Sequence, residues 1–513
     1  MQTPHPEPLG RTDPRRTWRI ADDRRLPALE PFADRVLRHG PVVLREHLWD
    51  TDDRALAAEG VELLRSDAGW SVDRGDGPVE VPPDLDGGDD HDADHVPRDV
   101  VEVFLRGRPV RVVRVRDTAT TLVELRGRDG RLRAEVADVR VDEGEPDAAV
   151  LRSARWWALS DDGRGGTVSR AAERALADAA EPGVGGGARG GAGRAGGGAG
   201  RAGGGAGHPA LRAAPERRKG TAGRPRRGSA AAALRAVLRS LRADLVAVDP
   251  RVRADEHGSV HDLRKVLRRL RSVLAAYRGA LDRDATEPLR AELAEVSRVA
   301  GVARDAEVLR DRLLRTAGRA PEGFVDAQTL DRIGAHVAES RAAAAADLRH
   351  TLRSATWFRA LDRLDDLVAR VPRGPHADDD AQAFTVRRIA RERKRVAKAI
   401  DGGTETLDDL HEVRKAARRL RYALQAADEA TDLGKRHLGL LRRVQDSLGE
   451  VLDAAHATAA HRELATLAAR SGADTFGAGV LATTEHAVVE RERDRAEHLV
   501  ARLRSRVATG LRG

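Results

Sequence analysis

Two stretches of the sequence repeat one pattern of histidine and cationic residues. The first, VHDLRKVLRRLRSVLAAYR, begins at Val260, and the second, LHEVRKAARRLRYALQAA, begins at Leu410. The repeated positions are His261, Arg264, Lys265, Arg268, Arg269 and Arg271 in the first stretch and His411, Arg414, Lys415, Arg418, Arg419 and Arg421 in the second. Arginine presents a planar fork of N–H donors that fits phosphate oxygens, and it stays charged at physiological pH. These residue types indicate a site for an anion.

Each stretch predicts an amphipathic helix, because its apolar and cationic residues fall on opposite faces at about 100° per residue. The apolar faces consist of Leu263, Val266, Leu267, Leu270, Val273 and Leu274, and of Val413, Ala416, Ala417, Leu420, Ala423 and Leu424. Like charges one turn apart, such as Arg264 and Arg268, repel each other by roughly a few tenths of a kcal/mol. Asp262 and Glu412 are the only carboxylates within the two motifs, so a bound anion is the simplest compensation. His261 and His411 lie in the first turn and can donate to the same anion.

A solvated cationic face is the alternative explanation for one such helix, but two copies in register favour a common role. If the two helices pack about a pseudo-twofold axis, both cationic rows line one groove. A long linear polyanion suits such a groove better than a small metabolite. A metal site at His261 and His411 is a weaker alternative, because neither has a neighbouring set of His, Cys or carboxylate ligands.

The composition narrows the class of protein. The chain has 513 residues, 34% of them charged, and a net charge of +8. It has no cysteine, which excludes disulfides, thiolate metal sites and cysteine nucleophiles. Aromatic residues make up only 3%, which argues against a reader of single-stranded nucleic acid. The polar, proline-containing start does not resemble a signal peptide, and no apolar run is long enough to span a bilayer. We therefore expect a cytoplasmic protein without a membrane partner.

The pattern of residues changes in the middle of the chain. The segment 181–228 contains GVGGGARGGAGRAGGGAGRAGGGAG and PERRKGTAGRPRRG, which are typical of a flexible linker. Before it, VEVFLRGRPVRVVRVRD, TTLVELRG and LRAEVADVRV predict strands, and GRDG predicts a turn. After it, the periodicity predicts helices near 230–248, 260–281, 286–315, 326–353, 356–370, 380–400, 405–430, 434–467 and 475–507, with breaks at residues such as Pro250 and Pro288. The predicted domains are an α+β unit at 1–180, the linker at 181–228 and an all-α unit at 229–513.

The motifs and the stretches around them resemble the CHAD family, an α-helical domain named for its histidines. The resemblance covers roughly 229–513 and includes LRAVLRSLRADLVAVDPRVRADE, VAGVARDAEVLRDRL and LLRRVQDSLGEVLDAAHA. It implies two pseudo-symmetric helical bundles, at about 229–373 and 376–513, around a basic surface that binds inorganic polyphosphate. It implies no catalysis, cofactor or metal. The implied phosphate contacts are the motif residues given above, extended by Arg388, Arg391 and Arg395 on the preceding helix. Arg304, Asp305, Asp446 and Asp453 are implied to support them, although simple ion pairs on the helix surface explain these four residues equally well.

The front half resembles the CYTH domain, whose intact members are metal-dependent triphosphate hydrolases built on an acidic β tunnel. HLWDTDDRALAAEGVELLRSDAGWSVDRGDGPVEV and DGRLRAEVADVRVDEGEP carry this resemblance. The family's opening Glu-x-Glu-x-Lys strand is absent, and the late strand reads ARWWALSDDG. Glu102, Glu124, Glu135 and Asp138 remain as candidate metal ligands, but we expect them to be too few. The prediction is a degenerate, noncatalytic CYTH-like antiparallel β barrel that serves as a docking element.

Three hypotheses for the function remain open. The first is a polyphosphate-binding protein, associated with polyphosphate granules. The second is a CYTH-type triphosphatase that uses Mg²⁺ or Mn²⁺, with the helical unit binding its substrate. The third is a nucleic-acid-binding protein that uses the same basic groove.

Overall fold

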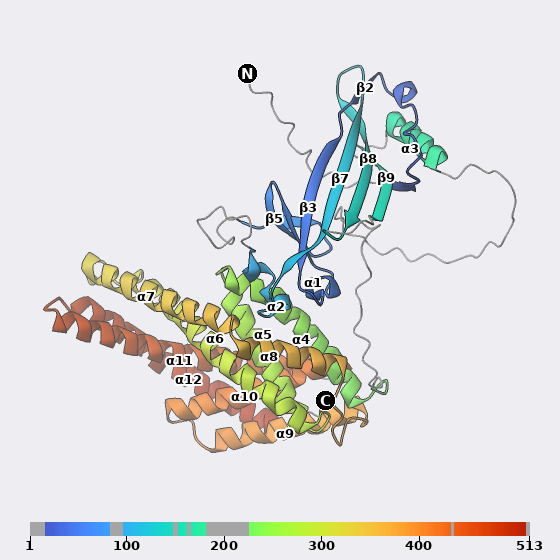
Figure 1. Cartoon of the computed structure of the whole chain (residues 1–513). Helices are drawn as coiled ribbons and strands as arrows, with labels where there is room; N and C mark the ends of the chain where they lie inside the picture. The colour runs from blue at the N-terminus through green and yellow to red at the C-terminus, as the bar shows by residue number, and fades with distance from the viewer. Residues whose placement is uncertain are drawn as a thin grey trace. The chain divides into compact units, whose positions relative to one another are not determined.

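The computed structural model describes residues 16–82, 96–146, 152–161, 166–180, 225–431 and 435–508. The chain divides into two compact units, Met1–Arg217 and Arg218–Gly513, which are described separately below (Figure 1). Most of the predicted linker, up to residue 224, lies outside the described residues.

The first unit is a nine-stranded antiparallel sheet in the order β1-β9-β8-β7-β3-β4-β5-β6, with β2 also paired to β7. The strands are β1 Arg16–Ile20, β2 Arg35–Arg38, β3 Val42–Asp50, β4 Glu62–Ser66, β5 Gly69–Asp73, β6 Pro78–Glu80, β7 Arg111–Arg126, β8 Leu132–Gly144 and β9 Arg152–Asp161. Within the described residues β1 pairs only with β9 and β6 only with β5, so the sheet is open. The predicted closed barrel is therefore wrong. The outermost strand β6 has three exposed residues and begins with a proline, so it offers little edge for closing a barrel.

Short helices accompany this sheet. They are η1 Glu30–Phe32, α1 Ala55–Ala58, η3 Arg98–Val100, α2 Glu102–Leu105 and α3 Thr167–Ala180. The alternation of β7 and β8 buries Val123, Leu125 and Val136 on one face, where Trp157 and the α3 residue Leu176 complete a core. The predicted strands in TTLVELRG and LRAEVADVRV are present as β7 and β8. The start of VEVFLRG instead forms α2, and all four α2 side chains are buried.

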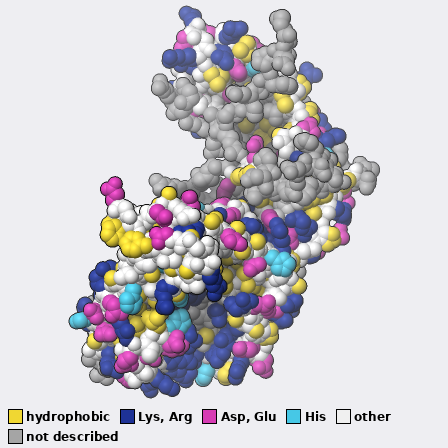
Figure 2. Space-filling view, turned by 90° about the vertical axis from the view of Figure 1, so that its left-hand side faces the viewer, with side chains coloured by type: hydrophobic (Ala, Val, Ile, Leu, Met, Phe, Trp, Pro, Cys, Tyr) yellow, Lys and Arg dark blue, Asp and Glu magenta, His cyan; other side chains and the backbone are white. Residues whose placement is uncertain are grey.

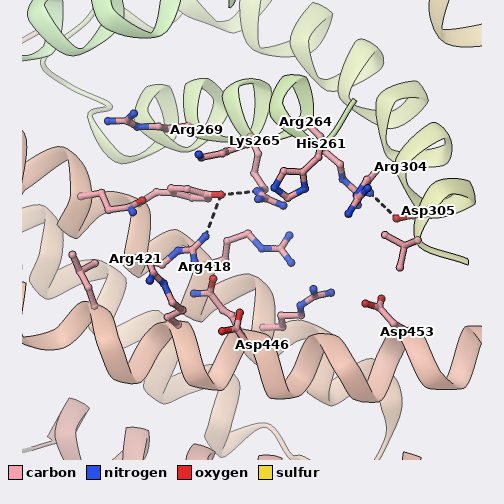
Figure 3. Close-up of a pocket in the computed structure, with 18 residues that line it drawn as sticks. His261, Arg264, Lys265, Arg269, Arg304, Asp305, Arg418, Arg421, Asp446 and Asp453 are labelled. Carbon is pink, nitrogen blue, oxygen red and sulfur yellow. Dashed lines mark hydrogen bonds and ion pairs between the residues drawn. The ribbon is translucent and has the colours of Figure 1, made fainter. Parts of the chain in front are cut away.

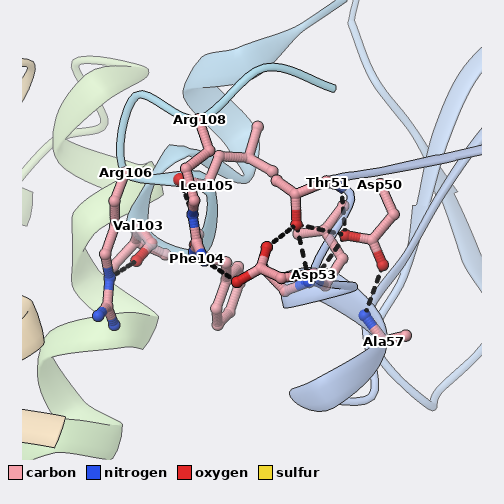
Figure 4. A network of polar contacts seen from close by, with 11 residues as sticks. Asp50, Thr51, Asp53, Ala57, Val103, Phe104, Leu105, Arg106 and Arg108 are labelled. Carbon is pink, nitrogen blue, oxygen red and sulfur yellow. Dashed lines mark hydrogen bonds and ion pairs between the residues drawn. The ribbon is translucent and has the colours of Figure 1, made fainter. Parts of the chain in front are cut away.

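A polar network joins the turn after β3 to α2 (Figure 4). The buried Asp50 carboxylate accepts hydrogen bonds from the backbone N–H groups of Thr51 at 2.7 Å, Leu56 at 2.9 Å and Ala57 at 3.0 Å. Asp53 accepts a hydrogen bond from the Thr51 hydroxyl at 2.6 Å and one from Arg108 at 2.7 Å. These two carboxylates of the DTDD stretch therefore cap a turn and tie it to α2, rather than facing an open site.

The second unit contains, in its described part, the nine helices that the periodicity predicts. They are α4 Ala230–Arg253, α5 Ser259–Ala276, α6 Arg283–Ala317, α7 Ala327–Leu352, α8 Ala355–Ala369, α9 Ala381–Asp401, α10 Leu407–Thr431, α11 Lys435–Arg470 and α12 Phe476–Ala508. Ser229, Asp282, Asp326, Ser354 and Asp380 cap the starts of five of these helices. None of the described helices is both long enough and apolar enough to cross a membrane.

Two of the expected proline breaks lie inside helices. Pro288 is within α6, and α4 continues past Pro250 to Arg253. The extra turn of α4 is held by tertiary contacts, because the buried Arg253 guanidinium donates to Asp249 at 2.6 Å and to the Leu352 carbonyl at 2.5 Å. Trp357 also donates to the Asp249 carboxylate, at 2.9 Å. These bonds offset the hydrogen bond that proline cannot make.

The apolar faces predicted for the two motif helices form the core. All twelve of the predicted apolar side chains on α5 and α10 are buried. A cluster formed by α9 to α12 includes Val413, Leu420 and Leu448. A second cluster contains Leu313 of α6, Ile333 of α7, Leu464 of α11 and Leu481 of α12, so it joins elements from the two predicted halves. Figure 1 shows α6–α7 and α11–α12 as two long antiparallel helix pairs.

A buried ion pair accompanies this second cluster. Arg312 of α6 donates to Glu485 of α12 at 2.7 Å and to Glu450 of α11 at 2.9 Å. The side chains of Arg312 and Glu485 are only 8% and 2% exposed. Thr316 donates to the other oxygen of the Glu485 carboxylate. One arginine thus connects the first predicted half to both long helices of the second.

The burial of His461 on α11 leads us to expect that the free energy of unfolding decreases measurably in acid. Its side chain is fully buried, neither ring nitrogen has a hydrogen-bond partner within the described residues, and burial lowers its pKa to about 4. The unfolded chain binds the proton at a higher pH, so stability is present above pH ~6.5 and is lost as the pH falls toward 4. We expect His461 to contribute about 3 kcal/mol to the decrease in unfolding free energy between pH 7 and pH 4.

Urea denaturation of the parent and of His461→Leu across this pH range measures that contribution as a difference. The His461→Leu curve should fall less steeply with acid. His350→Leu is the matched control, because His350 is exposed near the end of α7. If the parent and His461→Leu curves run parallel, His461 does not titrate as described.

Candidate functional site

Four helices of the second unit enclose a cavity of about 760 Å³. Its walls are the two motif helices, α5 and α10, and the helix that follows each of them, α6 and α11 (Figure 3). The lining residues are His261, Arg264, Lys265, Arg268, Arg269, Arg304, Asp305, Val308, Arg414, Arg418, Arg421, Tyr422, Gln425, Leu438, Arg442, Gln445, Asp446 and Asp453. The cationic rows of the two repeated motifs thus open into the same space.

The cavity carries a large excess of positive charge. Nine of its lining residues are Arg or Lys and three are Asp, which leaves a net charge of +6. His261 adds little to this charge at neutral pH, because burial lowers its pKa and the neighbouring Arg304 lowers it further. In Figure 2 many Lys and Arg side chains also cover the visible face of the helical unit, interspersed with Asp and Glu. Such a concentration of cations favours an anionic ligand.

On the α5 side, a carboxylate holds one of the arginines. Arg264 donates to Asp305 at 2.6 Å and to the carbonyl of Gly301 at 3.1 Å, and both acceptors are on α6. Arg304 instead pairs with Glu307 of its own helix at 2.8 Å. Asp305 therefore orients a cavity arginine, whereas Arg304 belongs to an ordinary pair on one helix.

Tyr422 links the two motif helices within the cavity. Its hydroxyl accepts a hydrogen bond from Arg268 of α5 at 2.6 Å and one from Arg421 of α10 at 3.4 Å. Both guanidinium groups also lie over its ring, at 5.7 Å and 5.1 Å from the centroid. Burial alone would raise the pKa of this hydroxyl, but the charges and hydrogen bonds of the two arginines lower it. The tyrosine thus fixes two guanidinium groups at the crossing of the helices.

The buried positive charges of two α10 arginines, Arg414 and Arg418, are poorly balanced by nearby carboxylates. Burial lowers the pKa of Arg418 to about 9, and the charges of Arg414 and Arg268 act in the same direction. Burial also lowers the pKa of Arg414, although Asp453 opposes that shift. The Nε atoms of Arg414 and Arg421 are buried and have no hydrogen-bond partner within the described residues. These groups would gain most from an anion in the cavity.

A glycine makes room for one of these guanidinium groups. A Cβ atom at Gly449 of α11 would lie 2.9 Å from an Nη atom of Arg414. The absence of a side chain at Gly449 therefore lets Arg414 lie close to the α11 backbone.

Not all of the motif residues line this cavity. Arg271, His411, Lys415 and Arg419 lie outside its lining, and Lys415 pairs with Glu412 at 2.7 Å. Burial lowers the pKa of His411, as it does for His261. The two histidines of the repeat therefore have different positions relative to the cavity.

The predicted extension on α9 does not reach the cavity either. Arg388 donates to the carbonyls of Ala276 and Ala275, which ties α9 to the end of α5. Arg395 pairs with Glu392 at 2.5 Å, and Arg391 is exposed. None of these three arginines is among the lining residues.

Arg442, Tyr422 and Gln425 also line the cavity, but the sequence analysis did not predict them. The spacing of polar residues on α11 could have indicated Arg442. Arg442, Gln445, Asp446, Gly449 and Asp453 recur at three- and four-residue spacing, so they fall on one face of α11. Nothing in the sequence distinguishes Tyr422 from an ordinary core aromatic residue.

The candidate metal ligands of the first unit do not converge. Glu102 is bound by Arg98 at 2.9 Å, Glu124 by Arg126 at 2.6 Å and Asp138 by Arg155 at 2.6 Å. Glu135 lies beside Glu124 in the β7–β8 register, and burial together with that neighbour raises its pKa. Within the described residues, no group of three or more His, Asp or Glu side chains is placed to hold a metal ion.

A second set of carboxylates in this sheet surrounds an arginine. Arg116 of β7 is buried and binds Glu62 at 3.0 Å and Glu143 at 2.9 Å. Arg114 donates to Glu143 at 2.5 Å. Glu46 lies nearby, and its pKa is raised by burial, a shift that Arg116 opposes. These carboxylates are occupied by guanidinium groups.

Comparison with known proteins agrees with the helical architecture. The family model of the CHAD domain matches residues 236–462, so the chain contains a CHAD domain. Uncharacterized proteins from two strains of Mycobacterium tuberculosis are each 32% identical over 265 residues, which is 50% of this chain and 50% of each relative. The match thus spans about half the length of these curated relatives.

Two solved structures are also similar. PptA from Streptomyces chartreusis has a TM-score of 0.45 and 21% identity, over 53% of this chain and 99% of that one. The CHAD domain from the plant Ricinus communis has a TM-score of 0.43 and 21% identity, over 53% of this chain and 92% of that one.

Proposed function

We propose that this protein binds inorganic polyphosphate in the cavity between α5, α6, α10 and α11, and that it does not catalyse a reaction there. The observation that carries this proposal is the meeting of two repeated cationic rows in one cavity with a net charge of +6. Burial and repulsion by neighbouring arginines lower the pKa values of Arg414 and Arg418, so a multiply charged anion would relieve both. A protein with this ligand is expected to collect on polyphosphate granules.

The character of the lining favours polyphosphate over nucleic acid. Proteins that bind single strands offer aromatic faces on which bases stack. Tyr422 is the one Phe, Tyr or Trp among the described residues that line the cavity, and two guanidinium groups already lie over its ring. Arginine donors distributed over four helices instead match a ligand that presents phosphate oxygens in every direction.

Titration of the full chain with long-chain polyphosphate, heparin and duplex DNA tests the proposal. Polyphosphate should displace duplex DNA at equal phosphate concentration, and DNA should not displace polyphosphate. If DNA competes as well as polyphosphate does, the nucleic-acid hypothesis is favoured. If polyphosphate fails to bind, the proposed function is wrong.

The charge of the cavity predicts a strong dependence of affinity on salt. Its net charge of +6 corresponds to about six neutralised phosphates. With the coefficient for single strands, log K should fall with log salt at a slope of about −4. Affinity measurements at several NaCl concentrations give this slope directly. A slope close to zero would mean that phosphate charge does not drive binding.

We infer that the sheet unit is noncatalytic. This inference is supported by Arg98, Arg126 and Arg155, which bind three of the four candidate metal ligands, Glu102, Glu124 and Asp138. Incubation of the full chain with triphosphate and Mg²⁺ or Mn²⁺ tests it. Hydrolysis that Glu124→Ala and Glu135→Ala abolish would restore the enzyme hypothesis.

A further inference from the structure

We propose that a second, smaller cavity at the C-terminal end of α5 is also a phosphate-binding site, and that one polyphosphate chain occupies both cavities. This inference rests on the proposed function of the first cavity. The second cavity has a volume of about 190 Å³. Its charged lining residues are Arg278, Arg290, Arg395, Arg419 and Glu392. Four cations thus face one carboxylate.

The single carboxylate of this site is already engaged. Glu392 of α9 is buried, and Arg395 of the same helix donates to its Oε1 atom at 2.5 Å. Its Oε2 atom is buried and has no hydrogen-bond partner within the described residues. Outside the lining, Glu287 pairs with Arg290 at 2.7 Å and lies 3.7 Å from Arg278. Two carboxylates therefore neutralise at most two of the four arginine charges, so the cavity keeps an excess of positive charge.

The arginines of this site repel one another. Arg278 is exposed, and its partial desolvation lowers its pKa; Arg290 and Arg395 lower it further against the opposing effect of Glu287. Arg271 lies close enough to Arg290 and Arg419 for their charges to add to the effect of burial on its pKa. No hydrogen bond or ion pair is found for the Arg419 guanidinium within the described residues. An anion in this cavity would compensate these charges, as in the first cavity.

The two cavities follow the same face of α5. His261, Lys265 and Arg268 face the first cavity, and Ser272 and Ala276 face the second. Their three- and four-residue spacing places them in one stripe along the helix. The stripe from His261 to Ala276 is about 22 Å long at 1.5 Å per residue. Its side chains become small at Ser272, Ala275 and Ala276, where the second cavity opens.

This second site also includes one motif residue that the first cavity leaves out, and another motif residue lies near it. Arg419 lines the second cavity, and Arg271 lies within electrostatic reach of Arg419 and Arg290. The second motif therefore divides its cations between the two cavities, whereas the first-motif cations that line a cavity all line the first one. A chain of a few phosphates can fill only one of them, whereas a long chain can occupy both.

The test compares two ligand lengths on the full chain. The Arg290→Gln/Arg419→Gln double variant removes two of the second site's charges. We expect it to lose about tenfold to a hundredfold in affinity for long-chain polyphosphate, because Arg419 is exposed and Arg290 is only half-buried, and solvent-accessible charge pairs contribute less than buried ones. Its affinity for tripolyphosphate should change by less than about twofold, since the first cavity is intact. The salt slope for the long chain should become shallower by about 1.4.

The Arg298→Gln/Arg502→Gln double variant is the control for net charge, because both residues are exposed and lie outside the two cavities. The exposed Arg278→Gln provides a second, independent variant and should show the same preference for long chains, with a smaller loss. Equal losses for both ligands, or no loss for either, would overturn the second site. If the parent binds neither ligand, the proposed function itself fails.

Discussion

Replacing Arg414 and Arg418 by methionine is expected to remove tight polyphosphate binding and to make the ligand-free protein more stable. Both arginines line the first cavity, and burial lowers the pKa of each, that of Arg418 to about 9. Each charged hydrogen bond to a phosphate contributes about 1.5–3 kcal/mol. Losing both should weaken binding by about 3–6 kcal/mol, or roughly a hundredfold to ten-thousandfold.

The expected gain in stability follows from the sign of the pKa shifts. A base whose pKa is lower in the folded state than in the unfolded state destabilises the fold at every pH where it is charged. At neutral pH the guanidinium groups of Arg414 and Arg418 are charged, and the nearby Asp453 only partly offsets the cost of burying Arg414. Methionine keeps the length of the side chain without its charge, so we expect a gain of about 1–3 kcal/mol. Thermal denaturation without ligand should show a higher midpoint for the variant.

Adding polyphosphate should reverse this order of stability. A ligand that binds only the folded state stabilises it in proportion to the logarithm of its concentration relative to Kd. The parent should therefore become more stable than the variant above a certain ligand concentration. Arg298→Met with Arg502→Met is the matched control, and it should change neither binding nor stability by more than about 0.5 kcal/mol. If the cavity variant binds as tightly as the parent, the cavity is not the site.

The helices were predictable because their signals are local. The apolar periodicity of each motif sets a buried face, and all the residues assigned to those faces are buried. The proline at position 250 does not end α4, because tertiary contacts outweigh its local penalty: Arg253 donates to the Leu352 carbonyl and Trp357 donates to Asp249. The sequence predicts a strand where the short helix α2 forms. All four α2 residues, Glu102 included, are buried, so no alternation of buried and exposed positions distinguishes a helix from a strand there.

The site was only partly predictable, because the two motif helices present different sectors to the cavity. The lining of α5 runs from His261 to Arg269, whereas that of α10 runs from Arg414 to Gln425. The two motifs have identical spacing, but α5 and α10 contact the cavity with different segments and different faces. His261 lines the cavity and His411 does not, although both occupy the same position of the repeat. A helical wheel assigns a face to each residue, but helix packing decides where along its axis each helix meets its neighbour.

Sequence patterns could not predict whether the sheet closes, because closure also depends on how separate elements pack. Alternation predicts strands, but closure requires the two outermost strands to pair with a suitable tilt and stagger. The short strand β6 and the five-residue strand β1 determine that outcome here. Neither of them carries a distinctive alternating pattern.

The second large effect is expected at Arg312, whose removal should cost about 3–5 kcal/mol of unfolding free energy. Arg312→Met leaves the Glu485 carboxylate buried with only Thr316 as a donor among the contacts described, and it also breaks the bond to Glu450. Removing one partner of a buried pair is costly because the remaining charge stays desolvated. Urea denaturation at neutral pH measures the loss. Arg370→Ala breaks a pair that is 61% exposed on both sides, and it should cost less than about 1 kcal/mol.

Replacing both charges should recover most of this stability. In Arg312→Met/Glu485→Met no buried charge of the pair is left, so the double variant is expected within about 1 kcal/mol of the parent. The same helices α6 and α11 carry Asp305 and Asp453 into the first cavity. If the ion pair sets how these helices meet, Arg312→Met should also weaken polyphosphate binding and the double variant should restore it. A single variant that remains as stable as the parent would mean that the apolar cluster around Leu313 and Leu481 alone holds the two halves together.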